Sequence, residues 1–307
     1  MAGYAQTLRL LDARRLRAVL LAARREVAEA GRDYERDPAL VELAEGAFES
    51  LAEAEERLRE FETRLRAAGD RRAVFLTIYT RMTARVRTAI ERGRFGDPAW
   101  MRQYTVRFAD YYRRAFLAFE RGNLNDVPDA WRVAFGTAVE GSALVAQDAF
   151  LGINAHINYD LALTLRDVGI DPGRAEKRAD HRHINDVLAG LVDAQQEALS
   201  DLYAPGISSV DASLGRFDEA LSLFSLTEGR TQAWRVATVL TDAGPGLVRR
   251  YARWVLRATA TGGALFVRAP ALDTDLLAAF RRVEAGVSLG EILDVLGEQM
   301  DERAETP

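Results

Sequence analysis

Apolar residues recur every three to four positions along most of this 307-residue chain, which is the spacing of amphipathic α-helices. Residues 5–30 show the pattern first, with Leu8, Leu11 and Leu16 set among arginines. The chain has only eight prolines, and helix-forming Ala, Leu, Arg and Glu dominate it. One short run, residues 263–267, resembles a strand but has no partner strands with which to form a sheet. The sequence therefore predicts an all-α protein, a multi-helix orthogonal bundle with an N-terminal helical hairpin.

The composition argues against several classes of function. Hydrophobic residues make up 48% of the chain and charged residues 28%, which is the profile of an ordinary globular protein. The net charge is −5 and no basic run is interleaved with aromatic residues, so we expect no nucleic-acid partner. The absence of cysteine excludes disulfides, thiolate metal ligands and cysteine nucleophiles. No apolar stretch approaches the roughly 20 residues of a membrane span and no signal peptide is recognisable, so we expect a cytoplasmic protein without a membrane span.

Turn signals divide the chain into two expected domains. Residues 5–30 and residues 38–68 read as the two arms of a helical hairpin with a highly charged outer face. We expect residues 1–69 to form this amphipathic hairpin and residues 70–307 to form an all-helical core domain. The charged face favours packing or oligomerisation over catalysis. The hairpin therefore suggests that a second copy of the chain binds through residues 1–68 to form a homodimer.

Proline and glycine signals place further helices in the core domain. A single long helix is expected from residue 129 to about residue 165, because its apolar pattern continues without an obvious stop. The stretch 204–215 is expected to be a loop, Gly262-Gly263 to interrupt the last strong pattern, and the tail after Glu298 to fray. The other expected helices cover residues 72–93, 98–121, 180–203, 215–225, 228–243 and 245–260, with two or three short ones following.

All three histidines lie within 28 residues, on two expected helices that are joined by a turn. His156 and Asp160 are four residues apart and therefore share one helix face, which is otherwise apolar or small. His181 and Asn185 share a face of the next helix in the same way, whereas His183 falls nearly opposite and is expected at the surface. Helices joined by a short turn run antiparallel and in contact, so the two pairs can meet in the interior.

This expected centre would suit a metal ion. His156, Asp160 and His181 would supply two imidazoles and a carboxylate to Zn²⁺ or Fe²⁺, and Asn185 or Asp180 would complete the shell. A bound metal would make a nucleophile of its water near neutral pH. Without a metal, the same His–Asp pair would be a general base. The alternative is structural: His156 with Asp160, and His181 with Asn185, would be hydrogen-bonded groups that order the core.

Four further residues are expected to bind a ligand or cofactor: Asn154, Asn158, Tyr79 and Arg230. The two asparagines lie on the helix of His156, and they need partners if that helix is central. Arg230 would bind an anion if its guanidinium pointed inward, although a surface or ion-paired arginine is the commoner arrangement. The many aromatic residues of the helix at 98–121 most simply form core, and the alternative is a pocket for a flat or lipid-like ligand.

Several segments of the chain resemble the DUF5995 family, whose function is unknown. The most specific is residues 152–161, which read Gly-Ile-Asn-Ala-His-Ile-Asn-Tyr-Asp-Leu. The resemblance covers about residues 70–260 and leaves the N-terminal hairpin outside. It implies no activity, but its motifs coincide with the histidine segment described above. The other matching segments are residues 75–79, 95–100, 127–131, 180–188 and 230–234.

Three functions are therefore open. The leading hypothesis is a hydrolase with a single Zn or Fe ion, acting on a small or lipid-like substrate. The second is a non-catalytic binding protein for an apolar ligand, which requires a cavity on the order of a few hundred Å³ beside Tyr79, Phe108 or Trp131. The third is a scaffold that dimerises through its N-terminal hairpin.

Overall fold

Capping residues and glycines set the ends of several helices. The side-chain oxygens of Asp37, Ser50 and Asp97 accept hydrogen bonds of 2.8–3.1 Å from backbone N–H groups in the first turn that follows each of them. Proline follows Asp37 and Asp97 at the first helical position. Gly69, with a φ of +65°, comes just after the helix that Ser50 begins.

The computed structural model describes residues 33–208, 226–243, 246–269 and 274–305, together with a few isolated residues before 32. These residues form twelve α-helices and one π-helical turn and contain no strand, which confirms the all-α prediction. Most of the expected first arm at residues 5–30, and the expected helix at 215–225, lie outside the described residues. The elements are α3 (Pro38–Ala44), α4 (Leu51–Ala67), α5 (Ala73–Glu91), α6 (Pro98–Glu120), α7 (Asp129–Glu140), α8 (Val145–Ala155), η2 (His156–Asp160), α9 (Leu161–Val168), α10 (Arg174–Ser208), α12 (Leu226–Asp242), α13 (Leu247–Arg268), α14 (Thr274–Ala285) and α15 (Leu289–Glu305).

Two of the expected helices are each divided in the structure. The single helix expected over residues 38–68 is instead α3 followed by α4, because Glu45 is extended and Ser50 caps a new helix. The long helix expected from 129 to 165 is divided between α7 and α8, because Gly141 adopts a φ of +64° and ends α7. The prediction of one continuous helix was wrong in both places.

The region around Gly262 and Gly263 is helical, contrary to the expected interruption. Both glycines lie inside α13, and the strand-like residues 263–267 belong to the same helix. A Cβ atom on Gly263 would lie 2.5 Å from Oδ1 of Asn154 on α8. Glycine is therefore needed at this position because α8 and α13 approach each other closely.

Two helices of the C-terminal half are longer than expected. α10 begins at residue 174 rather than 180 and includes residues 204–208, which the sequence pattern places in a loop. α15 continues to Glu305, so the tail after Glu298 is helical up to that residue. No helix in the described part of the chain, α10 included, is both long and apolar enough to cross a membrane.

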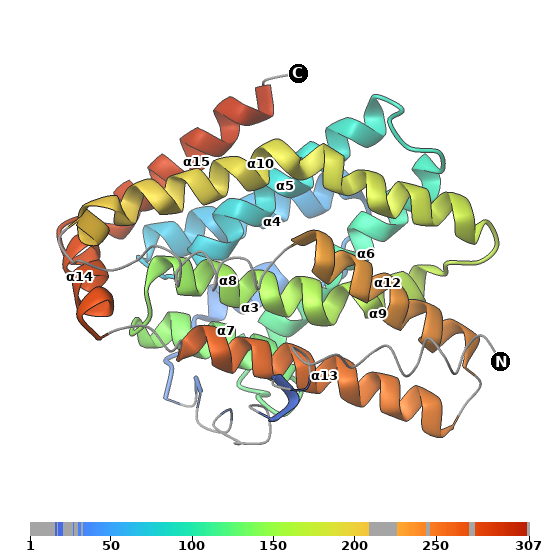
Figure 1. Ribbon diagram of the computed structural model, residues 1–307, viewed down its shortest axis with the longest axis horizontal. Coiled ribbons are helices and arrows are strands. Elements are labelled where there is room, and N and C mark those ends of the chain that lie inside the picture. Colours follow the sequence, from blue (N-terminus) through green and yellow to red (C-terminus); the bar gives the residue numbers. More distant parts are fainter. Residues whose placement is uncertain are drawn as a thin grey trace.

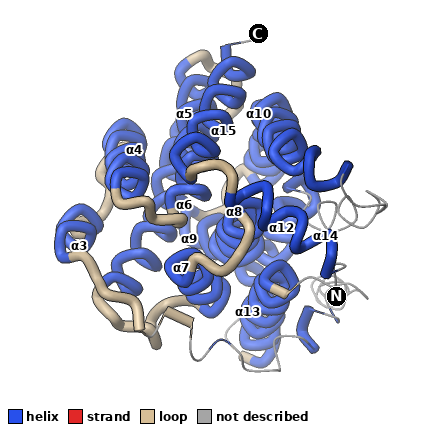
Figure 2. Tube along the Cα trace, turned by 90° about the vertical axis from the view of Figure 1, so that its left-hand side faces the viewer, coloured by secondary structure: helices blue, strands red, loops and turns tan. Residues whose placement is uncertain are grey.

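The segment α8–η2–α9 runs through the middle of the bundle (Figures 1 and 2). Helices α5, α7 and α13 pack against α8, and α6 and α12 pack against both η2 and α9. Nine of the 11 residues of α8 are buried, so this helix is enclosed on nearly every side. Its polar side chains must therefore find partners inside the protein.

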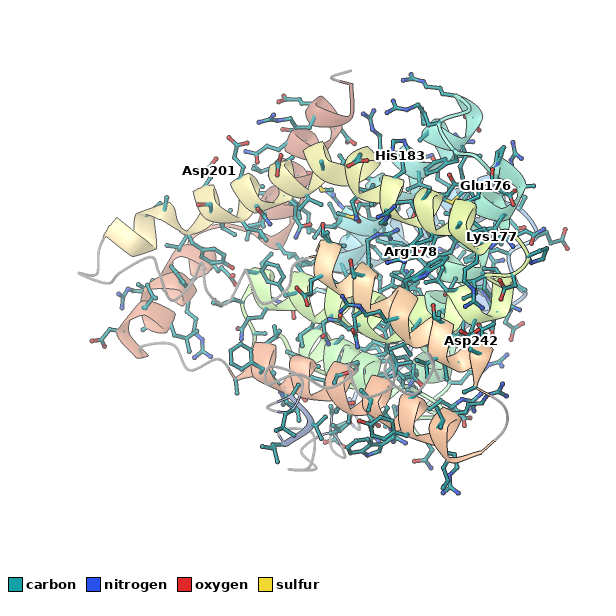
Figure 3. The ribbon with its side chains drawn as sticks, turned by 45° about the vertical axis from the view of Figure 1, so that its right-hand side comes forward. Glu176, Lys177, Arg178, His183, Asp201 and Asp242 are labelled. Atoms are coloured by element: carbon teal, nitrogen blue, oxygen red, sulfur yellow. The ribbon has the colours of Figure 1, made fainter. Side chains whose placement is uncertain are left out.

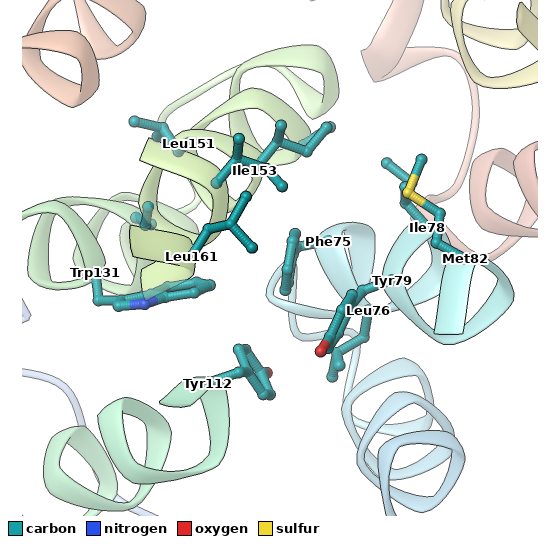
Figure 4. Close-up of a cluster of buried hydrophobic side chains, with 14 of the residues drawn as sticks. Phe75, Leu76, Ile78, Tyr79, Met82, Tyr112, Trp131, Leu151, Ile153 and Leu161 are labelled. Atoms are coloured by element: carbon teal, nitrogen blue, oxygen red, sulfur yellow. The ribbon is translucent and has the colours of Figure 1, made fainter. Parts of the chain in front are cut away.

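Aromatic side chains fill the core next to this central segment. The centroid of the Phe75 ring lies 5.3 Å from that of Tyr79 and 5.4 Å from that of Trp131. Figure 4 shows Phe75 between these two side chains. Gly152 of α8 faces the same ring, since a Cβ atom there would lie 2.5 Å from two atoms of Phe75. The contact between α5 and α8 therefore depends on a glycine in α8.

We predict that Gly152→Ala lowers the free energy of unfolding by roughly 1–2 kcal/mol, because the new methyl group overpacks the contact with Phe75. Gly190→Ala is the matched control, since Gly190 also lies within a helix and a Cβ there would meet no atom within 4 Å. It should leave stability unchanged or raise it by up to about 1 kcal/mol. Urea denaturation of both variants measures the difference, and equal stabilities would contradict the proposed contact.

Candidate functional site

His156 and Asp160 form a buried hydrogen-bonded pair in the middle of the central segment. They are the first and last residues of the π-helical turn η2, whose wider ring is closed by a bond from the Leu161 N–H to the His156 carbonyl. Nδ1 of His156 lies 2.9 Å from Oδ2 of Asp160. The two residues are 2% and 0% exposed. π-Helical turns are rare and often occur at functional sites.

Asp160 also receives a hydrogen bond from the neighbouring helix α7. Nε1 of Trp131 donates to Oδ2 of Asp160 at 2.7 Å. The second carboxylate oxygen, Oδ1, has no hydrogen-bond partner among the described residues. Burial raises the pKa of the Asp160 carboxyl, and the hydrogen bonds from His156 and Trp131 oppose that rise. Asp160 therefore connects the imidazole of His156 to α7.

Aromatic rings hold the His156 imidazole in place. It stacks on Phe108 with ring centroids 3.5 Å apart and an interplanar angle of 9°. The Tyr79 ring meets it edge to face, at 4.5 Å. Burial lowers the pKa of His156, so the neutral imidazole is favoured. With Asp160 ionised, Nδ1 carries the proton that is donated to the carboxylate, and Nε2 carries a lone pair.

Nε2 of His156 has no hydrogen-bond partner in the described part of the chain. A neutral imidazole whose Nδ1–H is held by a carboxylate can accept a hydrogen bond or a proton at Nε2. The structure thus brings His156 and Asp160 together, as the first of the two predicted pairs. Nε2 of His156 remains without a hydrogen-bond partner among the described residues.

His181, in contrast, uses both ring nitrogens in contacts with the protein. Its Nε2 donates to the carbonyl oxygen of Arg230 at 3.0 Å, and its Nδ1 accepts the hydroxyl of Tyr104 at 2.9 Å. Burial and the adjacent Arg230 cation hold the pKa of His181 well below its usual range. His181 is therefore a neutral residue that joins α6, α10 and α12.

The remaining members of the expected metal shell also have other partners. Both carboxylate oxygens of Asp180 accept backbone N–H groups, from Gly96 and Asp97, at 2.8 Å each. Asn185 is half-buried and makes no hydrogen bond to either His156 or His181. Within the described ranges, no three His, Asp or Glu side chains are arranged to hold a metal ion. The structure does not bring the four predicted ligands to one point.

His183 lies at the surface, as its helical phase predicts. Its side chain is 31% exposed, and its Nδ1 lies 3.1 Å from Oδ2 of Asp186, which is itself 77% exposed. Figure 3 shows His183 on α10, the helix that also presents Glu176 and Arg178. This second His–Asp pair is the exposed counterpart of the buried one.

Asn154 and Asn158 form a structural network on another side of the central segment. Nδ2 of Asn154 donates to the carbonyl of Ala260 in α13 at 2.8 Å, and Nδ2 of Asn158 donates to Oδ1 of Asn154 at 3.0 Å. Neither asparagine lines the cavity described next, so neither is placed to bind a ligand there. The other two residues expected to bind a ligand, Tyr79 and Arg230, both line it.

A cavity lies between α5, α6, the His156 end of η2, α10 and α12. The cavity has a volume of about 60 Å³. All the empty space between its lining atoms, including the part open to solvent, amounts to about 650 Å³. Its wall is almost entirely apolar, with Met82, Val86 and Phe108 among the lining residues. It adjoins Tyr79 and Phe108, where the binding hypothesis places it, but its volume of about 60 Å³ is smaller than the few hundred Å³ that the hypothesis requires.

Four residues that line this cavity each carry a buried polar atom without a hydrogen-bond partner among the described residues. These atoms are the hydroxyl oxygens of Tyr79 and Thr83, Nε2 of His156 and Nε of Arg230. Tyr79 and Thr83 are neighbours on α5, but no hydrogen bond of acceptable geometry joins their hydroxyls. Buried polar groups are nearly always paired, so four such atoms around one cavity need an explanation.

Three residues of the site lie outside the predicted set: Trp131, Tyr104 and Thr83. The first two belong to segments rich in aromatic residues, but nothing in the sequence connects Trp131 to Asp160 or Tyr104 to His181. These partners are 29 and 77 residues apart along the chain. Thr83 could have been found from the sequence, because it follows the predicted residue Tyr79 by one helical turn and therefore lies on the same helix face.

We predict that Asp160→Ala lowers the free energy of unfolding by about 3 kcal/mol, because it leaves the N–H groups of His156 and Trp131 buried and unpaired. Asp186→Ala removes the carboxylate of the exposed pair with His183 and should change stability by less than about 0.5 kcal/mol. Guanidinium denaturation of the two variants provides the comparison. A cost below about 1 kcal/mol for Asp160→Ala would show that the pair does not order the core.

The comparison with known proteins identifies a family. The model of DUF5995, a family of unknown function, matches residues 51–270. The match begins at the first residue of α4, so it includes much of the second arm of the expected hairpin, which the motifs had left outside, and it ends at residue 270 rather than about 260. No significant match was found among the curated proteins or among the solved structures. Because the family model covers more than half of the sequence, including the whole histidine segment, this chain belongs to the DUF5995 family.

Proposed function

We propose that this protein binds a small, largely apolar molecule in the cavity between α5, α6, η2, α10 and α12. The observation that carries the proposal is that four residues lining one apolar cavity each carry an unpaired buried polar atom. Ligand-binding sites are typically apolar hollows with a few polar groups that fix the orientation of the ligand. This cavity has both features.

The energetics favour an occupant over an empty cavity. Each buried polar atom that lacks a partner costs roughly 1–3 kcal/mol, and a ligand that pairs with even one of them recovers part of that cost. The cavity, at about 60 Å³, has room for roughly two water molecules, since each occupies about 30 Å³ in the liquid. Waters against an almost wholly apolar wall would lack hydrogen-bond partners, so an apolar molecule with one polar group can displace them favourably.

The volume limits the size of the ligand. A cavity of roughly 150 Å³ holds benzene, so a molecule of roughly six to eight non-hydrogen atoms would extend beyond the 60 Å³ into the rest of the 650 Å³ between the lining atoms. Rings and short chains are of this size. A long acyl chain would not fit without movement of the wall.

A second candidate function is acid–base catalysis on the bound molecule, and the geometry of His156 is the observation that favours it. Asp160 holds Nδ1 at 2.9 Å, which leaves the Nε2 lone pair of this cavity-lining residue without a partner among the described residues. This arrangement supports a general base that needs no metal ion. The hydrolase with one Zn or Fe ion is less well supported, because two of its expected ligands, His181 and Asp180, form hydrogen bonds with other protein groups.

The scaffold hypothesis stays a prediction. It depends on residues 1–68, of which the first arm lies mostly outside the described residues. The second arm packs inward: Leu58, Phe61 and Leu65 of α4 are fully buried, and α4 contacts α5 and α6. The division of the chain at residue 69 is likewise an expectation, as is the cytoplasmic location.

We predict that 1-hexanol, a small apolar molecule with one hydroxyl, binds the wild-type protein with one-to-one stoichiometry. Val86→Phe should weaken that binding at least about tenfold, because its ring occupies the cavity that Val86 lines. Val295→Phe makes the same exchange at a position that is 49% exposed on α15, and it should bind as the wild type does. Isothermal titration calorimetry measures all three. If 1-hexanol binds Val86→Phe as tightly as it binds the wild type, this cavity is not its binding site.

A further inference from the structure

Arg230 differs from the other buried arginines of the described residues. Three arginines are less than 9% exposed: Arg72, Arg113 and Arg230. The guanidinium of Arg72 is paired with the carboxylates of Asp70 and Glu120, and that of Arg113 with Asp110 at 2.6 Å. Arg230 is 4% exposed, and in the described chain no Asp or Glu oxygen lies within 4 Å of its guanidinium nitrogens.

The contacts of Arg230 are all with neutral groups. Its Nη2 donates to the carbonyl oxygen of His181 at 2.7 Å and approaches Nδ1 of the same residue at 3.4 Å. Its Nε has no hydrogen-bond partner within the described part of the protein, and the residue lines the cavity. The guanidinium carries a positive charge, and the described residues place no counter-charge beside it.

A buried charge without a partner is strongly destabilising, and proteins rarely keep one unless something else pairs with it. Asp160 cannot do so, because its carboxylate is engaged by His156 and Trp131 and does not line the cavity. The described residues supply no partner for this charge, and an anion that enters the cavity would supply one. One cation needs one negative charge to reach neutrality.

We infer that the ligand of this cavity is a monocarboxylate with a short apolar tail, whose carboxylate accepts a hydrogen bond from Nε of Arg230. This inference rests on the proposed binding function and names the class of its ligand. A carboxylate matches both the single charge and the N–H donor of the guanidinium. A phosphate would bring more charge and more oxygen atoms than this wall can serve. The tail would lie against Met82, Val86, Ile184 and Leu188, which line the same space.

The test compares hexanoate with 1-hexanol at neutral pH, since the two share a six-carbon skeleton and differ in their head group. Isothermal titration calorimetry of the wild-type protein should show hexanoate binding at least about tenfold more tightly, because hydrogen bonds to charged groups are the stronger class. Arg230→Met removes the charge but keeps an unbranched apolar side chain. It should weaken hexanoate binding at least about tenfold and change the affinity for 1-hexanol by less than about threefold.

Arg235→Met is the matched control, because Arg235 lies on the same helix α12 and is exposed. It should bind both compounds as the wild type does. If Arg230→Met does not fold, Arg230→Lys takes its place. That variant keeps the charge and loses the Nε donor, so its preference for hexanoate over 1-hexanol should be smaller than that of the wild type.

The outcomes separate the two proposals. If 1-hexanol binds as tightly as hexanoate to the wild type, the carboxylate inference is wrong, while the cavity remains a binding site. If neither compound binds, the proposed function itself fails. If sodium chloride or inorganic phosphate competes as strongly as hexanoate, Arg230 is a site for simple ions and the inference about the apolar tail is overturned. Selective binding of hexanoate that depends on Arg230 supports both proposals.

Discussion

One buried carboxylate, that of Asp160, sets the orientation on which the candidate site depends. It accepts N–H groups from His156 on its own turn and from Trp131 on α7, at 2.9 and 2.7 Å. The first bond fixes which edge of the imidazole faces the cavity, and the second fixes the turn relative to its neighbour. Because Phe108 stacks on the imidazole at 3.5 Å, the ring has little freedom to turn away. These contacts use Nδ1 and leave Nε2 without a hydrogen-bond partner among the described residues.

The two buried histidines show how similar local patterns lead to different roles. His156 has one partner on its own turn, so only one nitrogen is used. His181 lies between Tyr104 and the Arg230 carbonyl, 77 and 49 residues away along the chain, and both of its nitrogens are used. Each was paired in the sequence with a polar residue four positions later, and only His156 bonds to that residue, Asp160. The difference arises from neighbours that helical spacing does not reveal.

Local signals predicted much of the fold, because a helix depends on its own residues. Pro98 marked the start of α6, and the apolar spacing placed the ends of α5 and α6 within two residues of those observed. Glycine was the ambiguous signal: Gly141 ends α7, whereas Gly152 lies inside α8. Their surroundings differ, because a Cβ on Gly152 would be 2.5 Å from Phe75, whereas one on Gly141 would meet only Arg71, at 3.9 Å. A glycine that breaks a helix and one that permits close packing cannot be told apart without the neighbouring helix.

The candidate site was likewise predictable only where it depends on residues of a single segment. The His156–Asp160 pair follows from spacing within one segment, although η2 closes it through a π-helical turn. The cavity did not follow, since its wall comes from α5, α6, η2, α10 and α12, which only the tertiary fold brings together. Arg230 was recognised as a residue that could face an anion, but whether it lacks a carboxylate partner depends on every residue that surrounds it.

The family match covers the whole of the cavity wall. Residues 51–270 contain every residue that lines the cavity, from Phe75 to Arg230. Helices α14 and α15 follow the matched region, and both pack on α10, with α15 also against α5. They therefore pack against α5 and α10, two of the helices that form the cavity wall, and none of their side chains lines the cavity. The part of the chain that defines the family is the part that builds the cavity, so a function shared within the family would be expected to reside there.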